Sequence, residues 1–150
     1  MADKKYKTVI YSVAVELPKF QQEVFMHLVN LEKWWPEAFE GENVKLNSEF
    51  IFRTGEAHYS KNKVIEFVPN EKLVWLVTDA IRKTDEFNWS NSKFIFELAP
   101  KGNNTLVSFT YDGVVFEDEY DKLAMICEMT LKEMFYNFIM NGMEEYKIEF

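Results

Sequence analysis

The sequence predicts an α+β fold in which a curved antiparallel sheet of about seven strands wraps around one long C-terminal helix. Three observations lead to this fold class. A segment near the N-terminus alternates with period two, aromatic residues alternate through several segments between Asn43 and Tyr111, and an amphipathic segment runs from about Glu117 to Asn141. A long helix with one apolar face requires a partner, and we expect the sheet to supply it.

The first strand is expected over residues 6–17, because apolar and polar residues alternate there as in a half-buried strand. One face carries Val9, Tyr11, Val13 and Val15, and the other carries Thr8, Ser12 and Ala14.

Two short helices are expected next. Pro18 suits the first turn of a helix whose apolar stripe is Phe20, Val24, Phe25 and Leu28. Asn30 can cap the second helix, which ends with Trp34, Trp35 and Pro36.

The middle of the chain predicts strands and two hairpins. Phe50 and Phe52 alternate with polar residues, and a turn at Pro69-Asn70 separates two further alternating segments. The second hairpin turns over residues 100–104. The residues that alternate along the two hairpins are Ile65, Phe67, Leu73, Trp75, Val77, Phe94, Phe96, Leu98, Val107, Phe109 and Tyr111.

The C-terminal segment has the pattern of one amphipathic helix. Its acidic start at Glu117, Asp118 and Glu119 complements the helix dipole, and Asn141-Gly142 supplies a stop. The apolar face is Tyr120, Leu123, Ala124, Cys127, Leu131, Phe135 and Phe138. Residues 143–150 could extend this helix, add an edge strand or contact a second subunit.

Composition restricts the possible functions. A length of 150 residues with 47% hydrophobic composition fits a single domain spanning residues 1–150. The net charge of −8 argues against nucleic-acid binding. Without a signal sequence or a membrane-spanning segment, we expect a cytoplasmic protein that does not insert into membranes. Cys127 is the only cysteine, so an intrachain disulfide is impossible.

The aromatic content of 17% can either fill a core or line a cavity. The order of segments, the Trp-Trp-Pro sequence at residues 34–36 and the sequence KVIEFVPNEKLVWLV at residues 63–77 resemble the START or SRPBCC superfamily of helix-grip folds. Within it, the chain resembles the homologues of the activator of heat-shock protein ninety ATPase, over approximately Tyr6 to Gly142.

The resemblance implies a pocket between the concave face of the sheet and the C-terminal helix. We expect Trp34 and Trp35 near its mouth and Met125, Met129 and Met134 as flexible residues beside its rings. Strand parity and the resemblance together predict the remaining ligand-binding residues: Phe50, Phe52, Tyr59, Trp75, Phe94, Phe96, Phe109, Leu123, Cys127, Leu131 and Met134.

The sequence assigns no catalytic residue, metal site or cofactor. His27 and His58 lack the spacing of metal ligands and are interpreted as surface residues. Cys127 is interpreted as an inert apolar residue, because its position in mid-helix offers nothing to activate a thiol. Charged strand residues could enter the cavity but are expected on the solvated face, and these are Glu49, Arg53, Glu66 and Asp79.

Three functions therefore stay open. The first is binding of a small apolar or aromatic molecule, such as a lipid or a polyketide. The second is an enzyme of the polyketide cyclase or aromatase type, and the third is a partner module that activates a chaperone ATPase. A homodimer is a further possibility.

Overall fold

The computed structural model describes residues 5–35, 37–54, 58–84 and 86–141. It begins with strand β1 (Tyr6–Leu17), which is followed by helices α1 (Gln21–Leu28) and α2 (Leu31–Trp34). The remaining strands are β2 (Ala38–Gly41), β3 (Glu49–Thr54), β4 (His58–Val68), β5 (Lys72–Arg82), β6 (Lys93–Lys101) and β7 (Asn104–Phe116).

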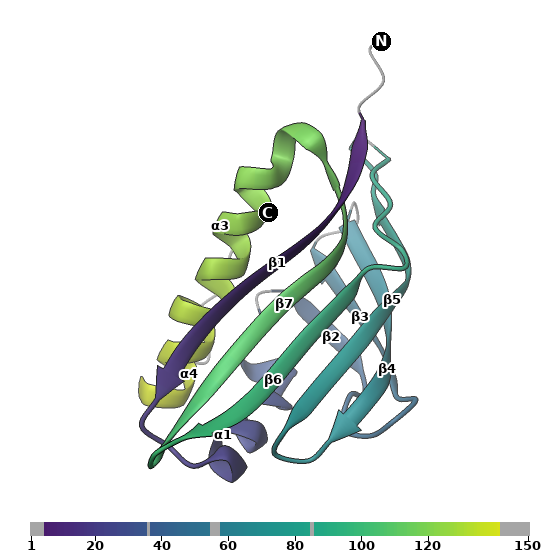
Figure 1. Cartoon of the computed structure of the whole chain (residues 1–150). Coiled ribbons are helices and arrows are strands. Elements are labelled where there is room, and N and C mark those ends of the chain that lie inside the picture. Colours follow the sequence, from purple (N-terminus) through teal and green to yellow (C-terminus); the bar gives the residue numbers. More distant parts are fainter. Residues whose placement is uncertain (1–4, 36, 55–57, 85, 142–150) are drawn as a thin grey trace.

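The seven strands form one antiparallel sheet in the order β1-β7-β6-β5-β4-β3-β2. The sheet curves, and a long helical segment of the chain lies along its concave side beside β1 and β7 (Figure 1). Helices α1 and α2 connect the two edge strands of the sheet. The predicted helix-grip class is therefore confirmed.

Strand β1 has the predicted sidedness. Val13 is buried and Val9, Tyr11 and Val15 are half-buried, while the alternate positions are exposed. Every residue of β1 pairs with β7, from Tyr6 opposite Phe116 to Leu17 opposite Thr105. This pairing joins the first strand to the last and places both beside the C-terminal helix.

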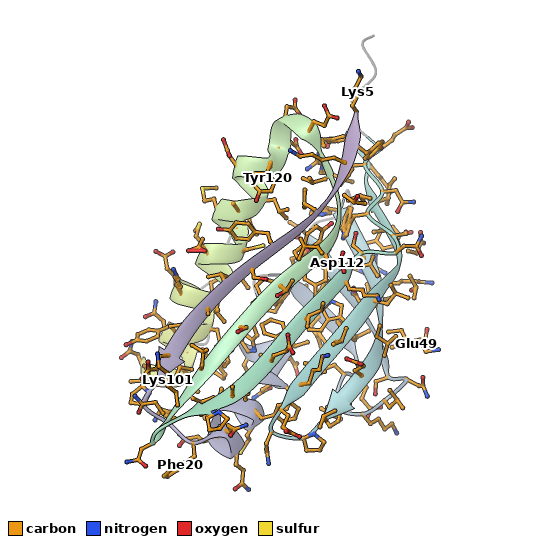
Figure 2. The ribbon with its side chains drawn as sticks, in the orientation of Figure 1. Lys5, Phe20, Glu49, Lys101, Asp112 and Tyr120 are labelled. Atoms are coloured by element: carbon orange, nitrogen blue, oxygen red, sulfur yellow. The ribbon has the colours of Figure 1, made fainter. Side chains whose placement is uncertain are left out.

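Helix α1 begins later than Pro18 suggests. Its first residue is Gln21 and its N-cap is Phe20, whose side chain is 70% exposed (Figure 2). Phe20 therefore does not belong to the buried stripe, which consists of Val24, Phe25 and Leu28. Asn30 does occupy the N-cap position of α2, but its side chain makes no capping hydrogen bond.

The hairpins differ from the sequence prediction mainly in their ends. Strands β6 and β7 pair as far as Lys101 opposite Asn104, so the turn is only Gly102-Asn103, where Gly102 has φ +61°.

The short edge strand β2 was not predicted from the sequence, because four residues are too few to display a clear period.

The C-terminal helical segment is continuous but not uniform. It starts with a 3₁₀ turn (Glu117–Glu119), continues as α3 (Tyr120–Met129), passes through a π-helical segment (Thr130–Phe135) and ends as α4 (Tyr136–Asn141). Thr130 Oγ1 donates a hydrogen bond to Ile126 O at 2.7 Å, where the π segment begins. Such side-chain bonds compete with the regular backbone ladder. Gly142 and residues 143–150 lie outside the described residues, as does Pro36.

Packed side chains fill one end of the interior between the sheet and the C-terminal helical segment. Trp34 is 2% exposed, donates from Nε1 to Leu28 O at 3.0 Å and packs against Phe96 and Phe135. Helix α1 packs against β6 and β7 at the end of the sheet where Figure 2 labels Phe20. The opposite end, near Tyr120, has no short helix beneath it (Figures 1 and 2).

Candidate functional site

A cavity of about 150 Å³ lies between the sheet and the start of α3. Glu119 and Lys122, which flank Tyr120 in sequence, both line it, so it occupies the end of the molecule where the C-terminal helical segment begins (Figure 2). Most of the lining is apolar or aromatic: Trp35, Phe87, Trp89, Phe94, Phe109, Tyr111, Val114, Val115, Leu123, Ile126 and Cys127, beside the polar Thr130. The charged or titratable lining residues besides Tyr111 and Cys127 are Glu37, His58, Arg82, Glu119 and Lys122.

The volume limits what the cavity can hold. A cavity of about 150 Å³ accommodates one benzene-sized ring. The aromatic side chains thus leave room for a modest guest, but a lipid or a polyketide of several rings exceeds the enclosed space.

The structure brings together five of the residues predicted from the sequence as ligand-binding. Trp35, Phe94, Phe109, Leu123 and Cys127 all line the cavity. The rings of Phe94 and Phe109 are parallel within 12° with centroids 6.0 Å apart, and the Trp35 ring stands nearly perpendicular to both. These five side chains form one continuous wall from α2 across β6 and β7 to α3.

Other residues of the predicted set point inward but do not line this cavity. The aromatic side chains among them pack on one another and on Trp35, and so they fill the interior. At 0% exposure, Trp75 stacks on Phe94 and contacts Trp35. The residues placed in this packed core are Trp34, Phe50, Phe52, Trp75, Phe96, Leu131 and Met134.

Tyr59 lies apart from both groups. Its hydroxyl donates to Asp79 Oδ2 at 2.8 Å, and the guanidinium of Arg53 lies 5.8 Å from its ring centroid. Met125 and Met129 also do not line the cavity, and Met125 is 54% exposed. The expectation that Met125 stands beside the rings is wrong, because the helix turns this side chain toward solvent.

Sequence reasoning missed several lining residues. Phe87 and Trp89 lie in the stretch between β5 and β6, for which the sequence predicted no element, although their spacing of two residues is a weak strand-like signal. Arg82 pairs in the backbone with Phe87 and also lines the cavity. Glu37 carries no sequence signal, because its position depends on how the chain leaves α2.

Glu37 is a carboxyl group of the lining that is bonded to the aromatic wall through Trp35. Its Oε2 accepts a hydrogen bond from Thr54 Oγ1 at 2.9 Å, and its Oε1 accepts one from Trp35 Nε1 at 3.4 Å. Burial raises the pKa of Glu37, and the two hydrogen bonds oppose this shift to a smaller extent. Among the described residues, no cation forms an ion pair with it.

An ion pair joins the sheet to the helix at the cavity. Arg82 Nη2 lies 3.0 Å from Glu119 Oε1, and both side chains are about one-fifth exposed, at 20% and 21%. The Arg82 guanidinium also lies 5.1 Å from the Phe87 ring centroid. This pair connects the end of β5 to the 3₁₀ turn that precedes α3.

Tyr111 belongs to the cavity wall, but its hydroxyl is engaged elsewhere. The hydroxyl lies 2.6 Å from Val114 O and 3.1 Å from Ser92 Oγ, and Ser92 Oγ accepts from Val114 N at 3.2 Å. Burial raises the pKa of Tyr111 to about 12. Its role in the lining is therefore that of an aromatic surface.

Cys127 lies at the centre of the helical wall and is 2% exposed. Burial raises the pKa of its thiol to about 12, and the neighbouring Glu128 carboxylate adds to this effect. The thiol is therefore protonated at neutral pH, as expected for an apolar lining residue.

The remaining candidates for chemistry are dispersed. His27 Nδ1 is 2.8 Å from Glu23 O on α1, whereas His58 lines the cavity and its ring centroid lies 5.0 Å from that of Trp89. His58 is half-buried, because it is the first residue of β4 and lies at the edge of the cavity. Glu49, Arg53 and Glu66 are exposed. Asp79 is half-buried and accepts the hydrogen bond from Tyr59.

The described residues contain neither a metal-ligand cluster nor a membrane-spanning helix. No group of three His, Cys, Asp or Glu side chains there is arranged to hold a metal ion. None of the helices is both long enough and apolar enough to cross a membrane.

Comparison with known proteins gives a family and several related folds. The model of the family described as Activator of Hsp90 ATPase homolog 1-like protein matches residues 23–138. No curated protein matches the sequence.

Three solved structures illustrate the similarity of fold. Mll3558 from Rhizobium loti has 16% identity and a TM-score of 0.69, over 85% of this chain and 95% of its own. The Aha1 dimer from Colwellia psychrerythraea has 20% identity and a TM-score of 0.65, over 91% and 97%. CalU16 from Micromonospora echinospora has 12% identity and a TM-score of 0.64, over 93% and 89%.

Proposed function

The chain belongs to the family of Activator of Hsp90 ATPase homolog 1-like proteins, within the SRPBCC superfamily, and from this premise we propose that it binds one small apolar or aromatic molecule in the cavity beside α3. The observation that carries the proposal is the unfilled volume of about 150 Å³ among aromatic side chains. Apolar lining with a few polar groups is typical of small-molecule sites.

The size of the cavity favours a guest with a single ring. Burial of the guest's apolar surface supplies the binding free energy, at roughly 25 cal/mol per Å². Larger members of the expected ligand classes, such as lipids and polyketides, would have to extend through the opening or displace part of α3.

Substitution at Cys127 tests the site without removing a ring. Cys127→Met adds a flexible apolar side chain that fills the cavity, and it should weaken toluene binding at least tenfold, roughly the cost of losing one ring-sized space. Cys127→Ala enlarges the same space and should preserve binding. Both can be measured by isothermal titration and by amide chemical shifts of β6 and β7.

The matched pair separates occupancy of the cavity from general effects of substitution at this buried position. Equal toluene affinity in the Met and Ala variants would contradict the site, and a wild-type protein that takes up no toluene would contradict the proposed function.

A second candidate function is proton transfer to or from the bound molecule, as in an enzyme of the cyclase or aromatase type. It is favoured by two titratable side chains in the lining, Glu37 and His58. Formation of a product during the binding experiments would distinguish this candidate from simple binding. A chaperone partner and self-association are proposals that follow from the family and from the dimeric relative alone.

A further inference from the structure

The Glu37 carboxyl is a polar group of the cavity lining that neighbouring side chains hold in place. The Glu37 carboxyl lies between Thr54 at the end of β3 and Trp35 at the end of α2, and each of its oxygens accepts one hydrogen bond. A carboxylate has about four acceptor positions. About half of its capacity is therefore available to a molecule in the cavity, and a carboxyl oxygen remains an acceptor whether or not the group is protonated.

The charges around the cavity favour a neutral guest. The lining includes two carboxylates, Glu37 and Glu119, and two permanent cations, Arg82 and Lys122. Because Arg82 and Glu119 are paired with each other, neither sign of charge dominates at this site. An anionic guest would meet Glu37, and a cationic guest would meet Lys122.

We propose that Glu37 is the polar recognition group of the cavity and that the ligand is a neutral aromatic molecule carrying one hydroxyl or N–H donor. This inference rests on the proposed function and specifies its ligand class. The ring lies against Trp35, Phe94 and Phe109, and the donor reaches the Glu37 carboxyl. An apolar cavity without such an acceptor would disfavour a hydroxyl, because the hydroxyl would lose its bonds to water without replacement.

Phenol and toluene are suitable probes, because they have nearly the same size and differ by a hydroxyl in place of a methyl group. At pH 7 the wild-type protein should bind phenol at least as tightly as toluene. Glu37→Leu should weaken phenol binding at least tenfold, as expected when a buried hydroxyl loses its partner, while toluene binding changes less than about threefold.

Three further variants make the test specific. Glu37→Gln keeps an acceptor oxygen and should therefore retain most of the wild-type phenol affinity. Thr54→Val removes the hydroxyl that orients Glu37 and should weaken phenol but not toluene, which gives a second measurement if Glu37→Leu fails to fold. Glu32→Leu, at an exposed position on α2, should change neither affinity.

The outcomes separate this inference from the proposed function. If toluene binds and phenol does not, or if both Glu37→Leu and Thr54→Val retain the wild-type phenol affinity, then Glu37 is not the recognition group, although the cavity still binds apolar molecules. If neither probe binds, the proposed function itself fails.

Discussion

Gly113→Ala is expected to lower the free energy of unfolding by about 3 kcal/mol, at the upper end of the usual range for overpacking. A Cβ atom at this position in β7 would lie 2.1 Å from Ser92 Oγ, 2.3 Å from Ser92 Cβ and 2.9 Å from Ser92 Cα. The added methyl group would push Ser92 away from Tyr111 and Val114, to which its hydroxyl is hydrogen-bonded. Denaturant unfolding measures the loss.

Two controls test this explanation. Gly102→Ala adds a methyl group that meets nothing within 4 Å, at a φ of +61°, so it should cost only about 1 kcal/mol of backbone strain. Ser92→Gly combined with Gly113→Ala removes the two closest contacts and should recover part of the lost stability. The packing explanation is wrong if Gly113→Ala is no more destabilising than Gly102→Ala.

Trp34→Ala is expected to cost about 4 kcal/mol, as is typical when a buried tryptophan is truncated to alanine. The ring is 2% exposed, and it packs against Phe135 at 4.9 Å and Phe96 at 6.0 Å between ring centroids. The indole N–H also donates to Leu28 O, which would lose this partner. Guanidinium unfolding curves of the wild type and of Trp34→Ala give the difference in the free energy of unfolding.

The neighbouring tryptophan provides the contrast. Trp34 does not line the cavity, whereas Trp35 does. Under conditions where it remains folded, Trp34→Ala should therefore bind toluene within about threefold of wild type, a change of less than 1 kcal/mol. Trp35→Ala should weaken binding at least tenfold, because it removes one ring of the wall. A larger loss of affinity in the Trp34 variant than in the Trp35 variant would contradict the assigned roles.

The alternation of residues predicted most of the strands and the inward-facing rings of β3, β5, β6 and β7. Phe50, Phe96 and Phe109 all point inward, as their parity indicated, because side chains on a strand alternate strictly between faces. Parity cannot say whether an inward ring fills a core or lines a cavity. That outcome depends on where α1 and α2 pack, which is a tertiary property.

The polar part of the site was harder to predict. Glu37 and Arg82 have no distinguishing local pattern. Their positions beside the cavity depend on how β4, β5 and the end of α2 pack together. Similarly, the π-helical segment begins at Thr130, whose hydroxyl donates a hydrogen bond to Ile126 O. A count of apolar positions along the helix does not reveal such a bond. The assignment of the protein to the cytoplasm and to a single domain remains a prediction.

The central claim is that the space beside α3 is a binding site for a small aromatic molecule. A crystal of the protein soaked with bromobenzene tests it most directly, because the bromine atom can be located by its anomalous scattering. We predict one ordered peak among Trp35, Phe94, Phe109 and Cys127. A well-diffracting crystal with no bromine in this space, or with bromine bound only at the outer surface, would contradict the claim.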